Sequence, residues 1–465
     1  MIRYPHFRCG VFGMCLSRLL LVGLSTFGGL DAARAQPDYD HNCVTDLQDC
    51  LRFMDDYSAA RIEADLNLDG VVNAADFDAF SDSKAKPTFT YYWMVSTVWE
   101  PGRTMDTVTN LGSAPISRNA VIIYEQDFPK IPIVIGPNGV HGDKGIQLIL
   151  KSPDGTYTAW QANMAAWMAA HSVSVPTVVS ARVPAGFDGI LCLDLEVVLP
   201  LRELIVNFIG PGPQLNEWDD AVAAINTPIL DPAFKILAGW TAPPGAVGWA
   251  DLNSTQRVDL SSKAYRAIAL DFYLRTVEGA RAARPAAKIG FYGMPSGAWP
   301  FYDDARRALN DLLQPMWAQC DVLMPSLYQL YWTTTTPLVG PCPDAVNTPA
   351  ANATFFASAM EESRRIQTIT ARPGQIVIPF VWWHYKSQAG QCSPDVNPTL
   401  LVNDTNLKQL LTLPWWHGAD GLAIWGAYAR LGPANPLNWL DDSTTIGADF
   451  RARWSPIISR IACPR

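Results

Sequence analysis

Positive charge is scarce in this sequence, and so are long apolar segments. Its 35 Lys and Arg residues are outnumbered by 44 Asp and Glu residues, which gives a formal net charge of −9. No basic tract of the nucleic-acid-binding type is present, so we expect no DNA or RNA partner. After residue 35 no stretch is long and uncharged enough to cross a bilayer, and we expect no membrane span. The cysteines also lack the spacing of a zinc site.

The first 35 residues have the layout of a secretory leader. Three arginines precede an apolar stretch from Leu19 to Leu30, and Ala33-Arg34-Ala35 has the small-x-small form of a cleavage site. We therefore expect residues 1–35 to be a signal peptide. The mature protein is expected to be secreted, or to be periplasmic or at the cell surface.

An oxidising compartment would allow some of the remaining cysteines to pair. We expect Cys43 to pair with Cys50, and Cys342 with Cys392. Cys192 lies inside an apolar run and is expected to be a packed thiol.

An acidic stretch after the leader contains a duplicated loop. Asp65 to Asp76 places oxygen-bearing residues at the positions of a twelve-residue calcium loop, with Gly70 at its sharp turn. A second copy begins at Asp38 and has Cys43 in place of the glycine. The predicted Ca²⁺ ligands are Asp65, Asn67, Asp69, Val71 (through its carbonyl oxygen), Asn73 and Asp76 in one loop, and Asp38, Asp40, Asn42, Asp46 and Asp49 in the other.

This pair of loops resembles a dockerin-type domain, in which each of two calcium loops is followed by a helix. Residues 50–54 and 77–80 are short apolar segments in the places of those helices. The resemblance implies a small all-α EF-hand or dockerin-like domain over residues 36–83, with structural calcium and a protein partner. An acidic, solvated linker is the alternative interpretation.

Beyond a linker at residues 84–87, strand patterns alternate with helix patterns over residues 88–465. Runs rich in apolar, aromatic and β-branched residues predict strands at 91–99, 131–135, 288–292, 375–382 and 421–425. Helices are predicted at 161–171 and, over a longer stretch, at 261–284. This alternation predicts an α/β fold, specifically a parallel (β/α) barrel of the TIM type.

One predicted strand of this barrel ends in two carboxylates. Ile190 to Leu193 are apolar without interruption, as in a strand buried on both faces, and Asp194 and Glu196 follow. Side chains two positions apart on an extended chain point the same way, and the carboxyl ends of barrel strands form the active-site rim. The alternative is a strand that simply runs out into solvent.

Two carboxylates on one strand edge favour substrate-assisted chemistry. They cannot easily flank a scissile bond, but they suffice if the 2-acetamido group of the sugar is the nucleophile. We assign Glu196 as the general acid/base and Asp194 as the group that holds the acetamide and balances its developing charge. This chemistry needs no cofactor.

Four motifs in order resemble the hyaluronidases, glycoside hydrolase family 56, over residues 88–465. They are Gly189 to Glu196, Lys288 to Pro295, Asp321 to Tyr328 and Gly421 to Gly426. The resemblance implies an endo-β-N-acetylhexosaminidase acting on hyaluronan or a related acetamido polysaccharide. It also implies an acetamide pocket walled by Tyr292, Tyr328 and Trp425, and Tyr385 is a further subsite candidate.

The sequence departs from that family at Leu195, where the family has tryptophan, and at Gly297-Ala298-Trp299, where it has Cys-Tyr-Asn. Two alternatives remain open. One is a carbohydrate-binding barrel without catalysis, delivered by its calcium module. The other is a chitinase-like glycosidase, disfavoured because Cys192 stands where a chitinase needs an aspartate.

Overall fold

The structure of the chain is a computed structural model. It describes residues 47–61, 64, 71–73, 76–77, 89–96, 116–128, 157–195, 199–204, 213–296, 303–328, 349–382, 402, 404–427 and 450–462. Three predicted segments lie outside these ranges: the signal peptide, the calcium loop that begins at Asp38, as far as residue 46, and the strand at 131–135. The cysteine pairings lie outside them as well, because Cys43, Cys342 and Cys392 are not described.

The strands of the described residues pair in parallel throughout. They are β1 (Thr90–Ser96), β2 (Ile116–Ser117), β3 (Ala120–Tyr124), β4 (Ile190–Asp194), β5 (Lys288–Tyr292), β6 (Val322–Met324), β7 (Ile376–Val377), β8 (Phe380–Trp382) and β9 (Gly421–Ala427). Hydrogen bonds link them in the orders β3-β4-β5-β6-β7 and β2-β1-β9-β8.

These two ladders join into a ring. The chain passes from β2 directly into β3, and from β7 into β8, while Ser326 beyond β6 bridges to Phe380 of β8. With β2/β3 and β7/β8 each counted once, the nine strands of the described residues form a ring of seven. The predicted mixed α/β class with parallel strands is confirmed, and the ring is consistent with the predicted TIM-like barrel.

Strand alternation divides the core into an inner and an outer part. Ile190 and Cys192 of β4 pack inside the ring with Val322 and Met324 of β6. Leu191, the residue between them, packs with the helices outside. Successive side chains of a strand point alternately into and out of the ring. One set fills the barrel, and the other set packs against the helices around it. The prediction that Cys192 is a packed thiol is confirmed, since its side chain is buried in the inner cluster.

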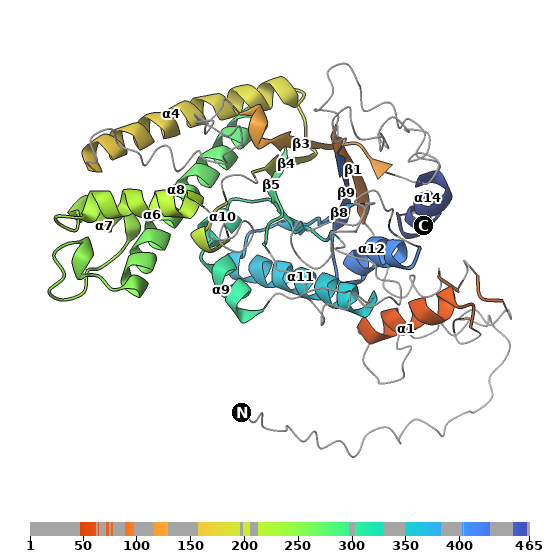
Figure 1. Cartoon of the computed structure of the whole chain (residues 1–465). Helices are drawn as coiled ribbons and strands as arrows, with labels where there is room; N and C mark the ends of the chain where they lie inside the picture. Colours follow the sequence, from red (N-terminus) through yellow and green to blue (C-terminus); the bar gives the residue numbers. More distant parts are fainter. Residues whose placement is uncertain are drawn as a thin grey trace, which may run out of the picture.

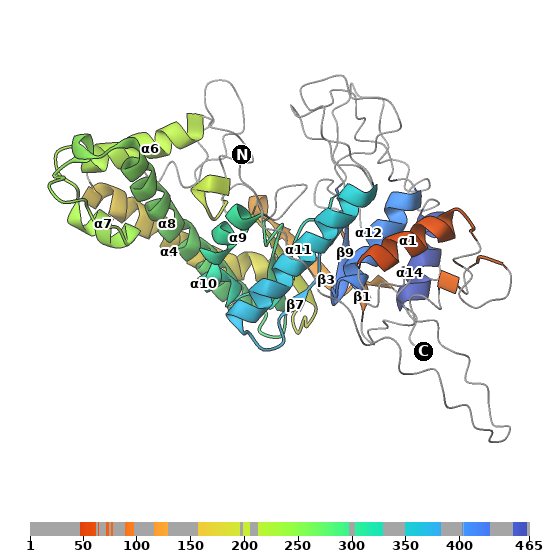
Figure 2. The ribbon, with the colours of Figure 1, turned by 90° about the horizontal axis from the view of Figure 1, so that it is seen from below.

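Helices pack around the ring, and some extend away from it (Figure 1). They are α1 (Leu47–Ser58), α4 (Tyr157–Arg182), α6 (Pro213–Asn226), α7 (Pro232–Ala238), α8 (Ser254–Ala283), α9 (Asp304–Asp311), α10 (Gln314–Trp317), α11 (Pro349–Thr370), α12 (Asp404–Trp416) and α14 (Ser455–Ala462), with 3-10 turns at Glu125–Asp127 and Trp249–Asp251 and a π turn at Phe450–Trp454. Both ribbon views show α6 and α7 far from the barrel, packed along the first half of α8 (Figures 1 and 2). Among the described residues, no helix is long and apolar enough to span a bilayer.

Two elements differ from the sequence expectation. The helix expected at 161–171 extends to Arg182, because Val175 and Val179 pack against α8 and outweigh the weak helix propensity of this segment. The strand expected at 375–382 is divided into β7 and β8, since Pro379 between them has no N–H for the ladder.

Helix α1 lies beside α11 and α12 at the outside of the barrel (Figure 2). Phe53 of α1 and Phe77 are buried and belong to the same hydrophobic cluster as the barrel helices. The ammonium of Lys408 in α12 stands 5.1 Å from the ring of Tyr57. The described part of the N-terminal region therefore packs on the barrel, while its limits at 36–83 stay a prediction.

Candidate active site

The carboxyl ends of the strands bring polar and aromatic side chains to one rim of the ring. Asp194 is the last residue of β4, and Tyr124 and Tyr292 are the last residues of the flanking strands β3 and β5. Asp194 aligns with Tyr124 in the β3–β4 ladder, and the Leu193–Phe291 pair of the β4–β5 ladder directly precedes Asp194 and Tyr292. The three side chains therefore occupy neighbouring positions at one level of the barrel.

Asp194 is enclosed by the protein. Only 4% of its surface is exposed, although it is charged in its ordinary state. It follows Ile190 and Cys192, which both pack in the inner cluster, so strand alternation places Asp194 on the inner side. A buried carboxylate at the carboxyl end of a barrel strand makes Asp194 a candidate functional residue.

An aromatic cluster stands across the rim from β4. The ring of Tyr328 is stacked on Trp425, with centroids 5.4 Å apart and planes inclined by 23°. Tyr292 lies 6.0 Å from Tyr328, and Trp382 lies 5.7 Å from Tyr328 and 5.3 Å from Trp425. These distances are typical of aromatic side chains that hold one another in place, and such faces suit the apolar side of a sugar ring.

Trp425 also connects this cluster to β3. Its indole N–H donates a hydrogen bond of 3.0 Å to the hydroxyl oxygen of Tyr124, which is buried. On the other side, the Tyr292 hydroxyl is 3.5 Å from the hydroxyl of Ser326. The wall is therefore continuous from the neighbour of Asp194 in β3 to its neighbour in β5.

The structure brings together four of the six predicted catalytic and substrate-binding residues. Asp194, Tyr292, Tyr328 and Trp425 share the rim. Glu196 and Tyr385 lie outside the described residues, so their roles stay predictions. The sequence analysis missed Tyr124 and Trp382. Both are the final aromatic residue of a β-type run, which is the signal that could have identified them.

Carboxylates at the opposite end of the barrel have a different environment. Asp321, just before β6, accepts hydrogen bonds from the Arg281 guanidinium (2.9 Å), from the Ile289 N–H (3.1 Å) and from Arg372. Burial raises the pKa of Asp321, but these donors outweigh burial and leave the pKa below its ordinary value. A carboxylate saturated by donors in this way stabilises the fold, as expected at the amino-terminal face of a barrel.

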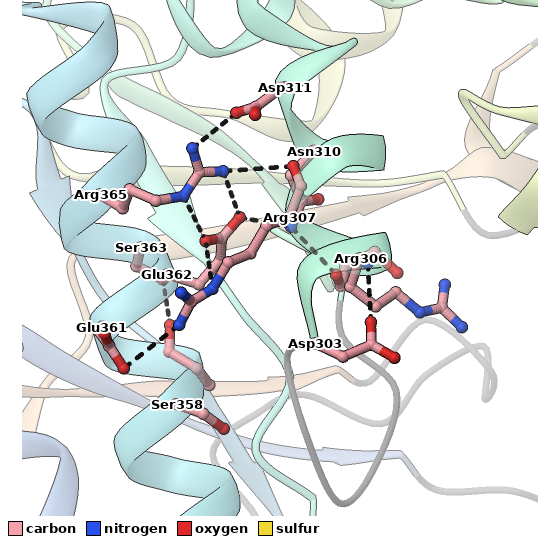
Figure 3. A network of polar contacts seen from close by, with 12 residues as sticks. Asp303, Arg306, Arg307, Asn310, Asp311, Ser358, Glu361, Glu362, Ser363 and Arg365 are labelled. Carbon is pink, nitrogen blue, oxygen red and sulfur yellow. Dashed lines mark hydrogen bonds and ion pairs between the residues drawn. The ribbon is translucent and has the colours of Figure 1, made fainter. Parts of the chain in front are cut away.

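A second saturated carboxylate joins two outer helices (Figure 3). Glu362 of α11 is fully buried and accepts from Arg365 Nε (2.7 Å) and from the Asn310 side-chain amide (2.8 Å). Arg365 also pairs with Asp311 of α9 at 2.7 Å. The same Asn310 amide donates to the carbonyl of Ser296, in the loop after β5, at 3.4 Å. This network joins α9, α11 and the loop after β5, and we assign it a structural role.

The described residues of the predicted calcium loop at Asp65–Asp76 carry oxygen atoms within one turn. The Asn73 N–H donates to Asp76 Oδ2 at 2.8 Å, and the Asn73 side-chain amide donates to the Val71 carbonyl at 2.9 Å. Carboxylate, amide and carbonyl oxygens fit a hard cation such as Ca²⁺. The other predicted ligands are not described, apart from the backbone of Asp49 in α1. In the described ranges, no group of three or more His, Cys, Asp or Glu side chains could hold a metal ion.

Comparison with solved structures gives a clear neighbour. Bee venom hyaluronidase superposes with a TM-score of 0.53 at 16% sequence identity, over 80% of this chain and 99% of that chain. The bee enzyme in complex with a hyaluronic acid tetramer gives a TM-score of 0.51 at 16% identity, over 81% of this chain and 100% of that chain. No family model matches the sequence, and no curated protein matches it. At this identity the likeness shows a hyaluronidase-like fold.

Proposed function

We propose that this chain is a glycoside hydrolase that cleaves hyaluronan or a related acetamido-containing polysaccharide inside the polymer. The observation that carries the proposal is the buried Asp194 beside Tyr124 and Tyr292, at the rim of a barrel with a hyaluronidase-like fold. The neighbour solved with a hyaluronic acid tetramer supports a polysaccharide as the substrate class.

In the proposed reaction the substrate supplies its own nucleophile. Glu196 protonates the glycosidic oxygen as the bond to the anomeric carbon breaks, and the acetamide carbonyl oxygen attacks that carbon from the opposite face. Asp194 accepts a hydrogen bond from the acetamide N–H and balances the positive charge that develops on the oxazoline-like ring. Deprotonated Glu196 then takes a proton from water, which opens this ring with overall retention of configuration.

The aromatic wall would orient the sugar for this attack. Tyr328 and Trp425 form one stacked unit, and Tyr292 is the aromatic residue of that wall next to Asp194. An acetamide methyl group packed against these rings would keep the carbonyl oxygen near the anomeric carbon. Such positioning converts the attack into a unimolecular step and lowers its entropic cost.

The decisive experiment is a panel of polysaccharides with and without acetamido groups, incubated with the protein and calcium. We expect new reducing ends from acetamido polymers only, with the first product in the β configuration by NMR. Glu196→Gln and Asp194→Asn should each lower kcat by at least about a hundredfold. Asp220→Asn is the matched control, because Asp220 is an exposed carboxylate of α6, a helix that lies far from the barrel (Figures 1 and 2).

Two outcomes would refute the proposal. Equal cleavage of a polymer without acetamido groups would exclude substrate assistance. Polymer binding with no release of reducing ends would instead support the carbohydrate-binding alternative.

For the N-terminal region we propose that residues 1–35 direct export, and that the two loops bind structural Ca²⁺ and dock a protein partner. Support comes from the leader pattern, from the loop spacing and from the oxygen atoms of Val71, Asn73 and Asp76. Calcium titration monitored by calorimetry, with Asp69→Ala as the variant, would test the metal site.

A further inference from the structure

We infer that two buried tyrosines of helix α8, Tyr273 and Tyr265, are positioning residues for the segment that carries Glu196. This inference rests on the proposed function and adds to it a supporting helix. Both hydroxyls donate to backbone carbonyls of residues that follow β4, and we do not place either tyrosine at the rim of the barrel.

Tyr273 holds the backbone between the two predicted catalytic carboxylates. Its hydroxyl donates a hydrogen bond of 3.1 Å to the carbonyl oxygen of Leu195, and its ring packs 4.6 Å from the ring of Phe291 in β5. Both Tyr273 and Leu195 are buried. This carbonyl belongs to the peptide group between Leu195 and Glu196. The hydrogen bond therefore fixes the orientation of that peptide plane.

Tyr265 holds the far end of the same segment. Its hydroxyl donates a hydrogen bond of 2.8 Å to the carbonyl of Leu199, and its ring meets Trp218 edge-on at 5.4 Å. Burial, followed by the charges of Glu125 and Glu203, raises the pKa of Tyr265 above its ordinary value. The hydroxyl therefore keeps its proton and stays a donor. Helix α8 thus holds the two described residues nearest to Glu196 in the sequence, Leu195 before it and Leu199 after it.

Helix α8 is a suitable support because it is long and well fixed. Its N-terminus is capped reciprocally by Asn253 and Gln256, with hydrogen bonds of 3.0 and 2.9 Å. The Leu195 side chain belongs to the hydrophobic cluster shared with α8, and the hydrogen bond from Tyr273 to the Leu195 carbonyl is itself buried. Removal of the Tyr273 hydroxyl would leave a buried carbonyl without this donor, and the peptide would turn to find another. If Glu196 is the acid of the proposed reaction, a turned peptide would impair its alignment with the glycosidic oxygen.

The chain offers a closely matched control for this hydrogen bond. Tyr91 of β1 is also buried and also donates to a leucine carbonyl, that of Leu411 in α12, at the same distance of 3.1 Å. Tyr273→Phe and Tyr91→Phe therefore remove the same group from equivalent environments, and only the first is next to the predicted acid. Tyr265→Phe should have an intermediate effect on kcat, because its acceptor, the Leu199 carbonyl, lies further along the chain from Glu196.

We expect Tyr273→Phe to lower kcat about tenfold on an acetamido polymer while KM changes less than about twofold. The limb of its kcat–pH profile that reports the acid should shift. Amide hydrogen exchange by mass spectrometry should accelerate about tenfold in peptides covering 195–204. Tyr91→Phe should lower the melting temperature about as much as Tyr273→Phe does. It should leave kcat, the kcat–pH profile and hydrogen exchange at 195–204 unchanged.

Equal loss of kcat in the two variants would overturn the inference, since both would then act through stability. An unchanged kcat in Tyr273→Phe, with an active wild type, would overturn it as well. If the wild type cleaves no polymer, the proposed function fails, and hydrogen exchange alone decides the role of α8. Faster exchange at 195–204 in Tyr273→Phe only would uphold it, and no difference between the variants would refute it.

Discussion

A buried histidine between α4 and α8 predicts how the protein responds to acid. His171 is 6% exposed and lies between aromatic rings, with the ring of Phe272 at 4.2 Å and that of Trp167 at 5.9 Å. Its Nε2 is 2.8 Å from the hydroxyl of Thr276, which itself donates to the Phe272 carbonyl at 2.7 Å. The Thr276 oxygen therefore accepts, and His171 is neutral with its proton on Nε2.

Burial, followed by the nearby positive charge of Arg275, lowers the pKa of His171 from 6.5 to about 4. The unfolded chain then binds a proton at a higher pH than the folded chain, so acid favours unfolding. This loss of folding free energy is absent above about pH 7.5 and grows as pH falls through 6.5, the ordinary pKa of histidine. It amounts to about 2 kcal/mol at pH 5 and about 3 kcal/mol at pH 4.

The assay is urea unfolding followed by tryptophan fluorescence between pH 8 and pH 4, for the wild type and for His171→Phe. The phenylalanine keeps the aromatic stacking and cannot titrate, so the variant should lose about 2 kcal/mol less between pH 8 and pH 5 than the wild type. Asp321 does not interfere, because its lowered pKa removes stability only as pH falls below its unfolded value of about 3.9. Identical pH dependence in both proteins would refute the reasoning.

Two further predictions concern the network of Figure 3 and the rim. Glu362→Ala should lower the free energy of unfolding by about 3–5 kcal/mol in chemical denaturation, because Arg365 Nε and the Asn310 amide lose their buried acceptor. Glu361→Ala, which removes a carboxylate exposed by 69%, should change it by less than about 1 kcal/mol. Trp425→Phe removes the N–H donated to Tyr124 and should raise KM about fivefold, whereas Trp249→Phe, outside the barrel, should leave KM unchanged.

The sequence was most informative where structure depends on neighbours along the chain. The strand predicted at 288–292 has those bounds, because an apolar run between a proline turn and a glycine has few other conformations. Asp194 was found in the same way, since it directly follows the buried run of β4. Because side chains alternate along a strand, Asp194 faces the same side as Cys192 of the inner core, two positions earlier.

Contacts between distant segments were beyond that local information. The hydrogen bond from Trp425 to Tyr124 joins residues 301 positions apart, and it gives Tyr124 a role that its own surroundings in the sequence do not suggest. The second half of α4 is helical only because α8 covers it. Helix α7 was missed although its signals are local, with Asp231 as N-cap, Pro232 in the first turn and Gly239 at the C-terminus.

The register of β4 decides whether Asp194 can act at all, and it is set at the opposite end of the strand. A one-residue slip would move Asp194 into the helix layer and bring Leu195 to the rim. At the start of β4, a Cβ on Gly189 would collide with the backbone carbonyl of Asn119, so only glycine allows β3 to approach this closely. Asp188 reinforces the pairing by accepting from the Asn119 amide at 2.9 Å. Gly189→Ala should therefore cost about 1–3 kcal/mol of stability and lower kcat, although the substitution lies far from the rim. Circular dichroism would report the fold, and full activity in a folded Gly189→Ala variant would show that the register is fixed elsewhere.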